Sequence, residues 1–373
     1  MEKKPQALAL YFVGGIALLY APFAMELGHG FKLGIEENLQ YSILEWLLGE
    51  GYTTTGADHY QNFKDESLSW YIGQHAFFNG AALFVIALQL LKERLRIPLR
   101  MHQTLGVLYV ILFAVGLGSS TLYLLKQTPK DTYSGEIFYY ALWMLTVSTI
   151  ITLIMGLYNL GRQQRELHKI WMQYHFAWMF SAPVLRILWV LTGSLDGGSH
   201  IENNIASVTL SPLVLSGGMA LALYFKAGGN GGNKSHVKVS GYPLRRSDLI
   251  YLVTALTGCI SMTIWYLNSK PLLWQWIPLT IITFFMAAAF NLYLYLRAAK
   301  EGNWQRGRIS LIFLRFWALN PLLLSALLPL HRPFFVDEQQ AAMGTALSIW
   351  GIGLTICIFR AINEYSAFET RAT

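Results

Sequence analysis

The sequence carries little charge and almost no cysteine. Asp, Glu, Lys and Arg together make up 13% of its 373 residues, and the two cysteines are Cys259 and Cys357. The thiols form no C-x-x-C pair and lie inside separate apolar runs, so disulfide chemistry is excluded. Close metal-ligand spacings such as H-x-x-x-H are also missing from the segment that holds His29, Asp58 and His59. We interpret that segment as a polar lid.

Long apolar runs are what the sequence has in abundance. Hydrophobic residues make up 54% and aromatic residues 14% of the chain, and the charged residues gather between the runs. An apolar run of roughly 20 residues is long enough for a helix to cross a bilayer. The sequence therefore predicts an all-α, polytopic membrane protein with about ten transmembrane helices. The expected spans are 6–24, 69–91, 103–125, 137–160, 170–193, 205–225, 249–267, 273–297, 309–329 and 341–361.

The loops between these runs set the expected orientation. Lys and Arg gather in the segments 92–96, 162–169 and 245–246, on the side that also holds both termini, whereas most acidic residues lie on the other side. Because basic loops stay in the cytoplasm, we expect a bacterial inner (cytoplasmic) membrane protein with cytoplasmic N- and C-termini. The net charge of +7 then reflects this topology and contact with the lipid bilayer, and it does not indicate nucleic acid as a partner.

Residues 1–68 are expected to form an anchor helix and an outward-facing lid. The chain opens with Met-Glu-Lys-Lys before an apolar run, but no small-x-small cleavage site follows. We therefore interpret the run as an uncleaved anchor. Within the lid, residues 35–48 have the amphipathic spacing of a helix that lies along the membrane interface.

Two parts of the chain show a weak internal similarity. Pro-Leu-Arg occurs at 98–100 and again at 243–245, each time just before an expected span. Farther on, Pro183-Val-Leu has a counterpart in Pro321-Leu-Leu. Similarity at a fixed spacing indicates an internal repeat.

This repeat predicts the domain organisation. We expect two parallel four-helix units at 69–193 and 205–329, related by an axis along the membrane normal, followed by a last helix and a cytoplasmic tail at 341–373. Placing Pro183 on Pro321 sets residues other than histidine opposite the histidines of the first unit. The second unit is therefore expected to be a degenerate copy without a site.

Histidines mark the first unit as the part that holds a site. His102 opens the third expected span and His168 opens the fifth, so both imidazoles are expected at one depth near the cytoplasmic face. His175 follows His168 on the same helical face, roughly 10 Å deeper. Imidazoles from neighbouring helices are what a bis-histidine haem iron needs. We therefore expect His102, His168 and His175 to act as metal ligands that hold haem b.

Two further residues are candidates for cofactor binding. His75 lies in the outer part of the second expected span, with Asn79 one turn away. Arg186 lies far enough inside its span for an anionic partner, such as a haem propionate, a lipid head group or a substrate carboxylate. For all of these residues the alternatives are a ligand site without haem and a purely structural role at the lipid interface.

Two short motifs carry a resemblance to known proteins. His102-Gln-Thr-Leu-Gly-Val-Leu-Tyr109 and His168-Lys-Ile-Trp-Met172 resemble the paired signatures of a bacterial multi-pass membrane family of unknown function, over roughly residues 70–195. The layout of helices and histidines is also distantly similar to the ascorbate-reducible diheme cytochrome b family. This chain departs from that pattern because its fourth expected span, 137–160, has no histidine.

These features favour a b-type-cytochrome-like redox protein that exchanges electrons between a haem and a membrane quinone or similar carrier. A second interpretation is a transporter or a lipid- or small-molecule-binding protein without haem. A third is an accessory subunit without a site of its own. The scarcity of polar groups in the middle of the expected spans argues against transport of a charged solute.

Overall fold

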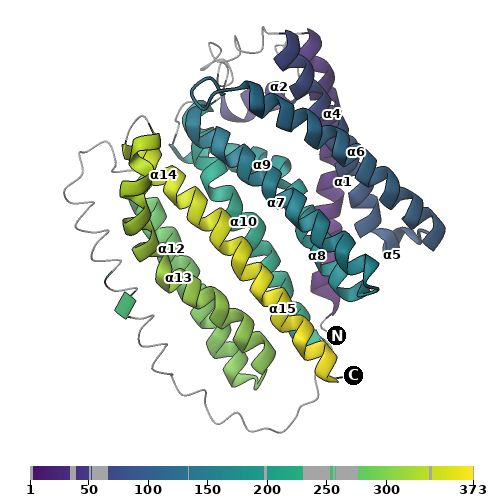
Figure 1. Cartoon of the computed structure of the whole chain (residues 1–373), viewed down its shortest axis with the longest axis vertical. Coiled ribbons are helices and arrows are strands. Elements are labelled where there is room, and N and C mark those ends of the chain that lie inside the picture. The colour runs from purple at the N-terminus through teal and green to yellow at the C-terminus, as the bar shows by residue number, and fades with distance from the viewer. Residues whose placement is uncertain are drawn as a thin grey trace. The chain divides into compact units, whose positions relative to one another are not determined.

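The computed structural model describes residues 3–33, 39–49, 52, 66–132, 134–196, 200–229, 253–254, 257, 276–335 and 338–372. Over these ranges every regular element is a helix and no strand occurs, which confirms the all-α prediction (Figure 1).

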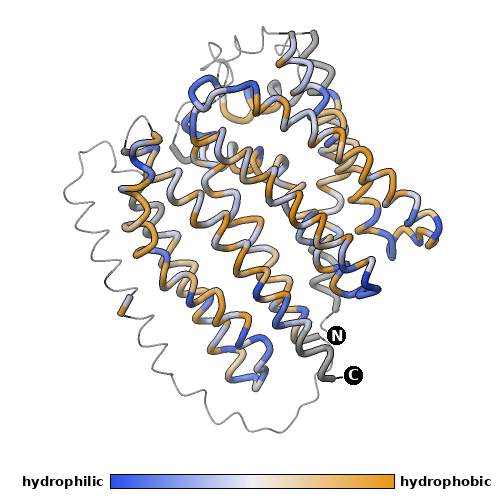
Figure 2. The backbone as a smooth tube through the Cα atoms, viewed as in Figure 1, coloured by the Kyte–Doolittle hydropathy of each residue, from blue (hydrophilic) through white to orange (hydrophobic). Residues whose placement is uncertain are grey.

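Six helices in the described part of the chain are long and apolar enough to cross a membrane. Figure 2 shows apolar residues along the helices and polar residues gathered at many helix ends. These helices support the predicted embedding in a membrane. The count of ten spans stays a prediction, since the expected span 249–267 lies almost wholly outside the described residues. The six candidates are Ser67–Leu90, Leu99–Lys126, Gly135–Gly161, His200–Ala227, Trp304–Phe334 and Gln340–Ser366.

The chain divides into two compact units, Met1–Ser211 and Pro212–Thr373, and the division falls inside helix α10 (His200–Gly229). In the first unit α4 packs against both α1 and α6, and α7 packs against α8. The domain boundaries drawn from the sequence stay predictions. The other helices of the first unit are α1 (Lys3–Leu33), α2 (Leu39–Leu48), α4 (Glu66–Leu90), α5 (Lys92–Leu95), α6 (Leu99–Lys126), α7 (Gly135–Gly161), α8 (Arg165–Met179) and α9 (Ser181–Asp196).

The expected span 170–193 is bent. α8 ends at Met179 and α9 begins at Ser181, with an angle of 45° between them. Pro183 accounts for the break, because proline has no N–H to donate to the carbonyl four residues earlier and its ring crowds that carbonyl. That carbonyl belongs to Met179, the last residue of α8. The expected span 170–193 therefore consists of two helices.

α4 and α6 approach closely at Gly116. A Cβ atom on Gly116 would lie 2.5 Å from Asn79 Oδ1 and 3.1 Å from the backbone N of Asn79, so glycine is required at this crossing. Ten residues earlier along α6, a Cβ atom on Gly106 would lie 3.4 Å from Gln89 Nε2. The two contacts fix the antiparallel register of α4 against α6.

The second unit is built around α13 (Trp304–His331), which packs against α12, α14 and α15. Pro321 and Pro329 lie inside α13 without ending it. Residues 226–229 form the last turn of α10, and residues 230–241 lie outside the described ranges. The neighbouring elements are α12 (Trp276–Lys300), η4 (Arg332–Phe334), α14 (Glu338–Ser348), the π-helical segment η5 (Ile349–Gly353) and α15 (Leu354–Ala372).

The helical hairpins α7–α8 and α12–α13 have matching turns. In each turn one residue has a left-handed backbone, with φ of 61° at Gln163 and 65° at Gly302. The next residue donates its N–H to a carbonyl in the last turn of the preceding helix. These bonds are Gln164 N to Asn159 O at 2.9 Å and Asn303 N to Ala298 O at 2.8 Å.

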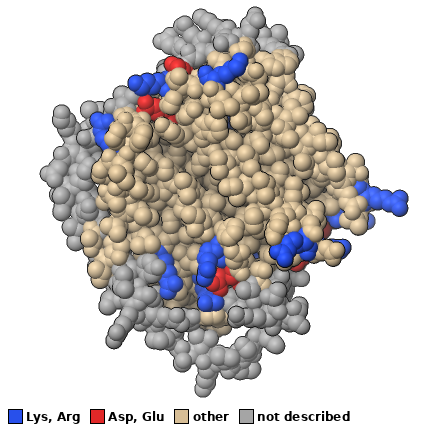
Figure 3. All heavy atoms as spheres, in the orientation of Figure 1, with Lys and Arg blue, Asp and Glu red and all other residues tan. Residues whose placement is uncertain are grey.

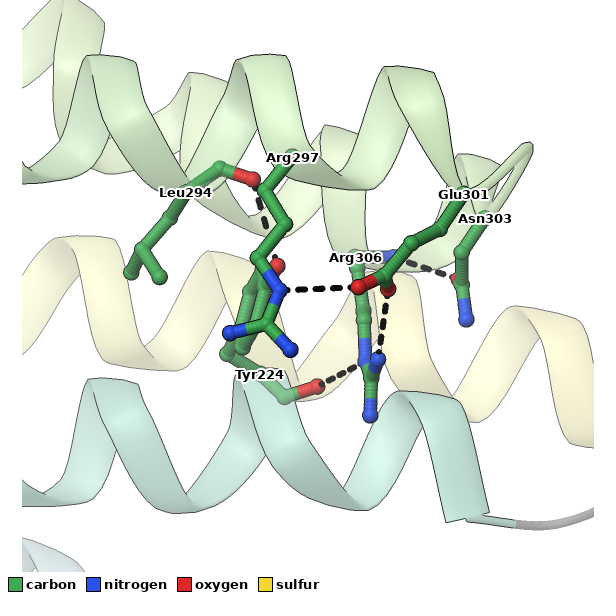
Figure 4. Close-up of polar contacts among 6 residues, drawn as sticks. All are labelled: Tyr224, Leu294, Arg297, Glu301, Asn303 and Arg306. Carbon is green, nitrogen blue, oxygen red and sulfur yellow. Dashed lines mark hydrogen bonds and ion pairs between the residues drawn. The ribbon is translucent and has the colours of Figure 1, made fainter.

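A charged network holds the α12–α13 turn of the second unit (Figure 4). The Glu301 carboxylate accepts hydrogen bonds from Arg297 Nε at 2.8 Å and from Arg306 Nη1 at 2.9 Å. Arg306 is buried and also donates from Nε to the Tyr224 carbonyl at 3.2 Å. Such charged residues lie at helix ends, while the face drawn in Figure 3 has a broad uncharged zone between them.

This network predicts a pH dependence of stability. The hydrogen bond from Arg297, and then the one from Arg306, hold the pKa of Glu301 below its usual value of 4.5. A lowered folded-state pKa contributes stability above pH 4.5, and this contribution is lost as the pH falls through the lowered value. We expect the melting temperature of the wild type to fall toward that of Glu301→Gln as the pH drops below 4.5, in thermal unfolding of detergent-purified protein.

A matched control is Glu93→Gln. Glu93 pairs with Lys169 at 3.6 Å, and its side chain is 84% exposed, so removal of its charge should leave the melting curve unchanged at every pH. Parallel pH profiles for the wild type and Glu301→Gln would contradict the stabilising role of the network.

Candidate functional site

His175 lies at the centre of the first unit and is fully buried. Its Nε2 is hydrogen-bonded to the Tyr109 hydroxyl of α6, and its Nδ1 lies 3.1 Å from Thr152 Oγ1 of α7. The rings of Tyr109 and Phe113 meet the imidazole edge-on, with centroids 5.7 and 5.1 Å away. Both ring nitrogens of His175 are therefore occupied by groups of the protein itself.

The bond between Tyr109 and His175 fixes the register of α6 against α8. α7 runs antiparallel to each of its neighbours in the chain, so α6 and α8 run in the same direction (Figure 1). His102 precedes Tyr109 by seven residues, and His168 precedes His175 by seven residues. His102 and His168 consequently lie at one level, roughly 10 Å along the helices from the buried bond.

Several polar atoms at this level, or one helical turn from it, have unused hydrogen-bonding capacity. His102 Nδ1 and Gln89 Nε2 are both buried, and neither has a hydrogen-bond partner among the described residues. The Gln89 amide lies against Gly106, one turn along α6 from His102. His168 differs, because its Nδ1 lies 2.8 Å from the Gly156 carbonyl and donates to it. That bond places the lone pair of the neutral ring on Nε2. These side chains thus offer two hydrogen-bond donors, on Gln89 and His102, and one acceptor, His168 Nε2.

A haem iron requires an imidazole nitrogen with a free lone pair, and His175 does not fit this requirement. Tyr109 and Thr152 hold its two nitrogens, and the aromatic rings around it close the space. Within the described ranges, no group of three or more His, Cys, Asp and Glu side chains is arranged to hold a metal ion. The three histidines expected to converge on one iron instead form two layers, with His175 in the deeper one.

His75 belongs to the α4–α6 interface, apart from these layers. Its Nδ1 lies 2.8 Å from Asn79 Nδ2 and 3.3 Å from the Gly116 carbonyl. The pairing with Asn79 agrees with their spacing of one helical turn. The structure brings no second histidine of the predicted set to His75, so it does not join the predicted cofactor site.

Arg186 lies in a polar cluster on α9 and the start of α10. Its guanidinium carbon lies 4.4 Å from the centre of the Trp189 ring, and the His200 ring meets Trp189 edge-on with centroids 4.6 Å apart. Trp189 Nε1 donates to Asn204 Oδ1 at 2.9 Å, and Asn204 Nδ2 donates to Ser134 Oγ at 2.8 Å. Arg186 is therefore engaged by the protein, and it is separate from the level of His102 and His168.

Sequence reasoning missed the polar character of α10. His200 precedes the expected span 205–225, yet it is the first residue of this helix and is buried. Asn203, Asn204, Ser207 and Ser211 follow at helical spacing and are also buried. The helical spacing of these polar residues was the signal that could have indicated a buried polar helix face. Because they lie at the edge of an apolar run, they resemble a loop in the sequence.

Comparison with known proteins supports the membrane class. Residues 72–220 match the model of a family described as a predicted membrane protein, DUF2306, which covers less than half of the chain. This agrees with the resemblance to a multi-pass membrane family of unknown function. No curated protein and no solved structure matches the chain. The two sequence signatures and the likeness to diheme cytochromes b stay predictions.

Proposed function

We propose that the first unit binds the carbonyl-bearing head of an apolar membrane molecule, with a quinone as the favoured ligand and without haem. The observation that carries the proposal is the pair of buried polar atoms Gln89 Nε2 and His102 Nδ1. They lie within about one helical turn of the level of His168 and have no hydrogen-bond partner in the described part of the chain. A buried polar group without a partner costs about 1–3 kcal/mol, so an unpaired set indicates that another molecule completes it.

The chemistry of these side chains suits a quinone. The Gln89 amide donates through Nε2, and a neutral His102 donates when its proton is on Nδ1. Quinone carbonyls accept such bonds. His168 Nε2 has a lone pair that can accept a hydrogen bond from the hydroxyl of the reduced quinol. Exposed side chains of α6, among them Val107 and Ile111, are apolar, so they suit contact with the apolar tail of a quinone.

A second candidate is a haem held by His102 and His168 alone. It is favoured by the bond from His168 Nδ1 to the Gly156 carbonyl, which is the kind of orienting contact that metal-bound histidines make. Bound haem would supply one-electron redox chemistry at this level. His175, through Tyr109, would then set the register of the two ligand helices.

The internal repeat is also proposed here. The matching turns place Gln163 opposite Gly302, an offset of 139 residues (302 − 163), whereas Pro183 and Pro321 are offset by 138 (321 − 183). The first unit therefore has one additional residue between its turn and its proline. An extra residue interrupts helical hydrogen bonding, and the break at Phe180 falls within this interval.

We also propose that the protein lies in a bacterial inner membrane and that both of its termini are cytoplasmic.

The test measures binding of decylubiquinone to protein in phosphatidylcholine nanodiscs that contain no quinone, by quenching of tryptophan fluorescence. We expect saturable binding by the wild type. Gln89→Leu and His102→Ala should each weaken the affinity about tenfold, because each removes one hydrogen bond worth about 1–1.5 kcal/mol. Tighter binding in ether-linked lipids than in ester-linked lipids would show that lipid carbonyls compete for the site.

The control is His331→Ala. His331 Nδ1 lies 3.0 Å from Thr345 Oγ1 in the second unit, so its loss should leave quinone affinity unchanged. Equal affinity in the wild type, Gln89→Leu and His102→Ala would refute the proposed site. An absorbance spectrum of the same samples distinguishes the candidates, since a Soret band that disappears in both His102→Ala and His168→Ala would favour haem.

A further inference from the structure

In the described part of the second unit, Asn320 and Trp350 each carry a buried donor without a hydrogen-bond partner. Asn320 on α13 is 2% exposed and Trp350 on η5 is 1% exposed. Neither Asn320 Nδ2 nor Trp350 Nε1 has a hydrogen-bond partner among the described residues. Both groups can only donate. In an apolar interior an N–H group without a partner is destabilising. An acceptor atom of a bound molecule would supply the missing hydrogen bond.

Helix pairing places these two donors at one level. A Cβ atom on Gly353 would overlap the Phe316 ring, so α13 and η5 are in contact there. Asn320 follows Phe316 by one turn of α13, and Trp350 precedes Gly353 by about one turn of η5. α14 follows α13 after a short connection, and α14 with η5 runs back along α13. The step forward from Phe316 to Asn320 and the step backward from Gly353 to Trp350 therefore point toward the same end of α13.

The level lies in the middle of the membrane-spanning segments. Asn320 stands at the centre of the candidate span Trp304–Phe334, and Trp350 lies near the centre of Gln340–Ser366. The backbone at Trp350 is π-helical over Ile349–Gly353. A π-helical turn inside a long helix is rare and frequently accompanies a functional site, and transporters place substrate sites at irregular helix segments near the midplane.

We propose that the second unit holds a binding site for a neutral carbonyl compound at mid-membrane depth, where Asn320 Nδ2 and Trp350 Nε1 both donate to the carbonyl oxygen. A carbonyl oxygen has two lone pairs, so one ligand atom can satisfy both N–H groups. Both protein groups are uncharged, and an ion would require an opposite charge at this depth. The site is independent of the one proposed in the first unit.

The depth also restricts the source of the carbonyl. Ester carbonyls of bilayer phospholipids lie at the interface, far from the middle of the spans. The ligand is therefore a molecule that dissolves in the hydrocarbon core or one that crosses the membrane. This proposal differs from the sequence-based expectation that the second unit is a degenerate copy without a site.

The test compares two probes that differ only in the acceptor, acetophenone and ethylbenzene. Thermal unfolding of the full-length, detergent-purified protein is measured with each probe in a background that carries both Gln89→Leu and His102→Ala, which lacks the two donors proposed in the first unit. We expect acetophenone to raise the melting temperature more than ethylbenzene does. Asn320→Leu and Trp350→Phe should each reduce this difference, and together they should abolish it.

The variants remain informative because they remove unpaired donors. Without a probe, each should fold and be at least as stable as its parent, since an unpaired buried donor is itself destabilising. Equal responses to the two probes in the parent would mean that the donors hold at most a water molecule, and this would overturn the proposal. So would an acetophenone response that persists unchanged in the double variant. Neither outcome bears on quinone binding in the first unit.

Discussion

His175→Leu is expected to destabilise the first unit by about 2–4 kcal/mol, the range typical for loss of a buried hydrogen-bonded network. Leucine has a volume close to that of histidine, so little cavity is added. The variant instead leaves the buried Tyr109 hydroxyl without the imidazole, and Thr152 loses the same partner. Chemical unfolding of the protein in mixed micelles measures the change in the free energy of unfolding.

A double-mutant cycle separates this hydrogen bond from a general packing effect. Tyr109→Phe removes only the hydroxyl that bonds to His175 Nε2. In the His175→Leu background Tyr109→Phe should cost nothing or restore stability, because it then removes an unpaired group. If the free-energy costs of Tyr109→Phe and His175→Leu simply add in the double variant, the two side chains do not stabilise each other. His168→Leu is a useful comparison, since His168 is only part-buried and bonds a backbone carbonyl.

The same network shows how far sequence reasoning reaches. The spacing of His168 and His175 correctly predicts two imidazoles on one helix at different depths, and the matching seven-residue interval to Tyr109 explains why His102 lies level with His168. The sequence could not show that Tyr109 would occupy His175. A tyrosine in an apolar run is ordinarily assigned to the lipid interface, and only the packing of α6 against α8 reveals its partner.

The helices themselves were easier to predict than their irregularities. Long apolar runs correctly indicate long helices, because a bilayer requires every backbone group to be bonded within a helix. The break at Phe180 could have been anticipated from Pro183, yet Pro321 lies inside an unbroken helix. The π-helical turn at Trp350 was not predicted from the sequence, and Gly353 at its end lies against the Phe316 ring. Unpaired donors such as Asn320 are recognised only when burial and partners are both known.

Gly353→Leu is expected to destabilise the second unit by about 1–3 kcal/mol, the usual cost of overpacking a filled core. A side chain there would overlap the Phe316 ring, and all three of the nearest atoms belong to that ring. Because the obstacle is one side chain, Phe316→Ala should restore much of the lost stability when it is combined with Gly353→Leu, although the same substitution in the wild type should destabilise by leaving a cavity. The free energy of unfolding in mixed micelles measures both changes.

The matched control for Gly353 is Gly218→Leu. Gly218 lies in α10 of the same unit, is exposed, and has no atom within 4 Å of the position where a Cβ would stand. Leucine forms helices better than glycine, so this substitution should stabilise the protein slightly, by up to about 1 kcal/mol. A loss of similar size at both positions would show that added bulk anywhere in the unit is harmful, and the contact between α13 and η5 would lose its support. Since that contact sets Asn320 level with Trp350, rescue of Gly353→Leu by Phe316→Ala also tests the geometry on which the carbonyl site depends.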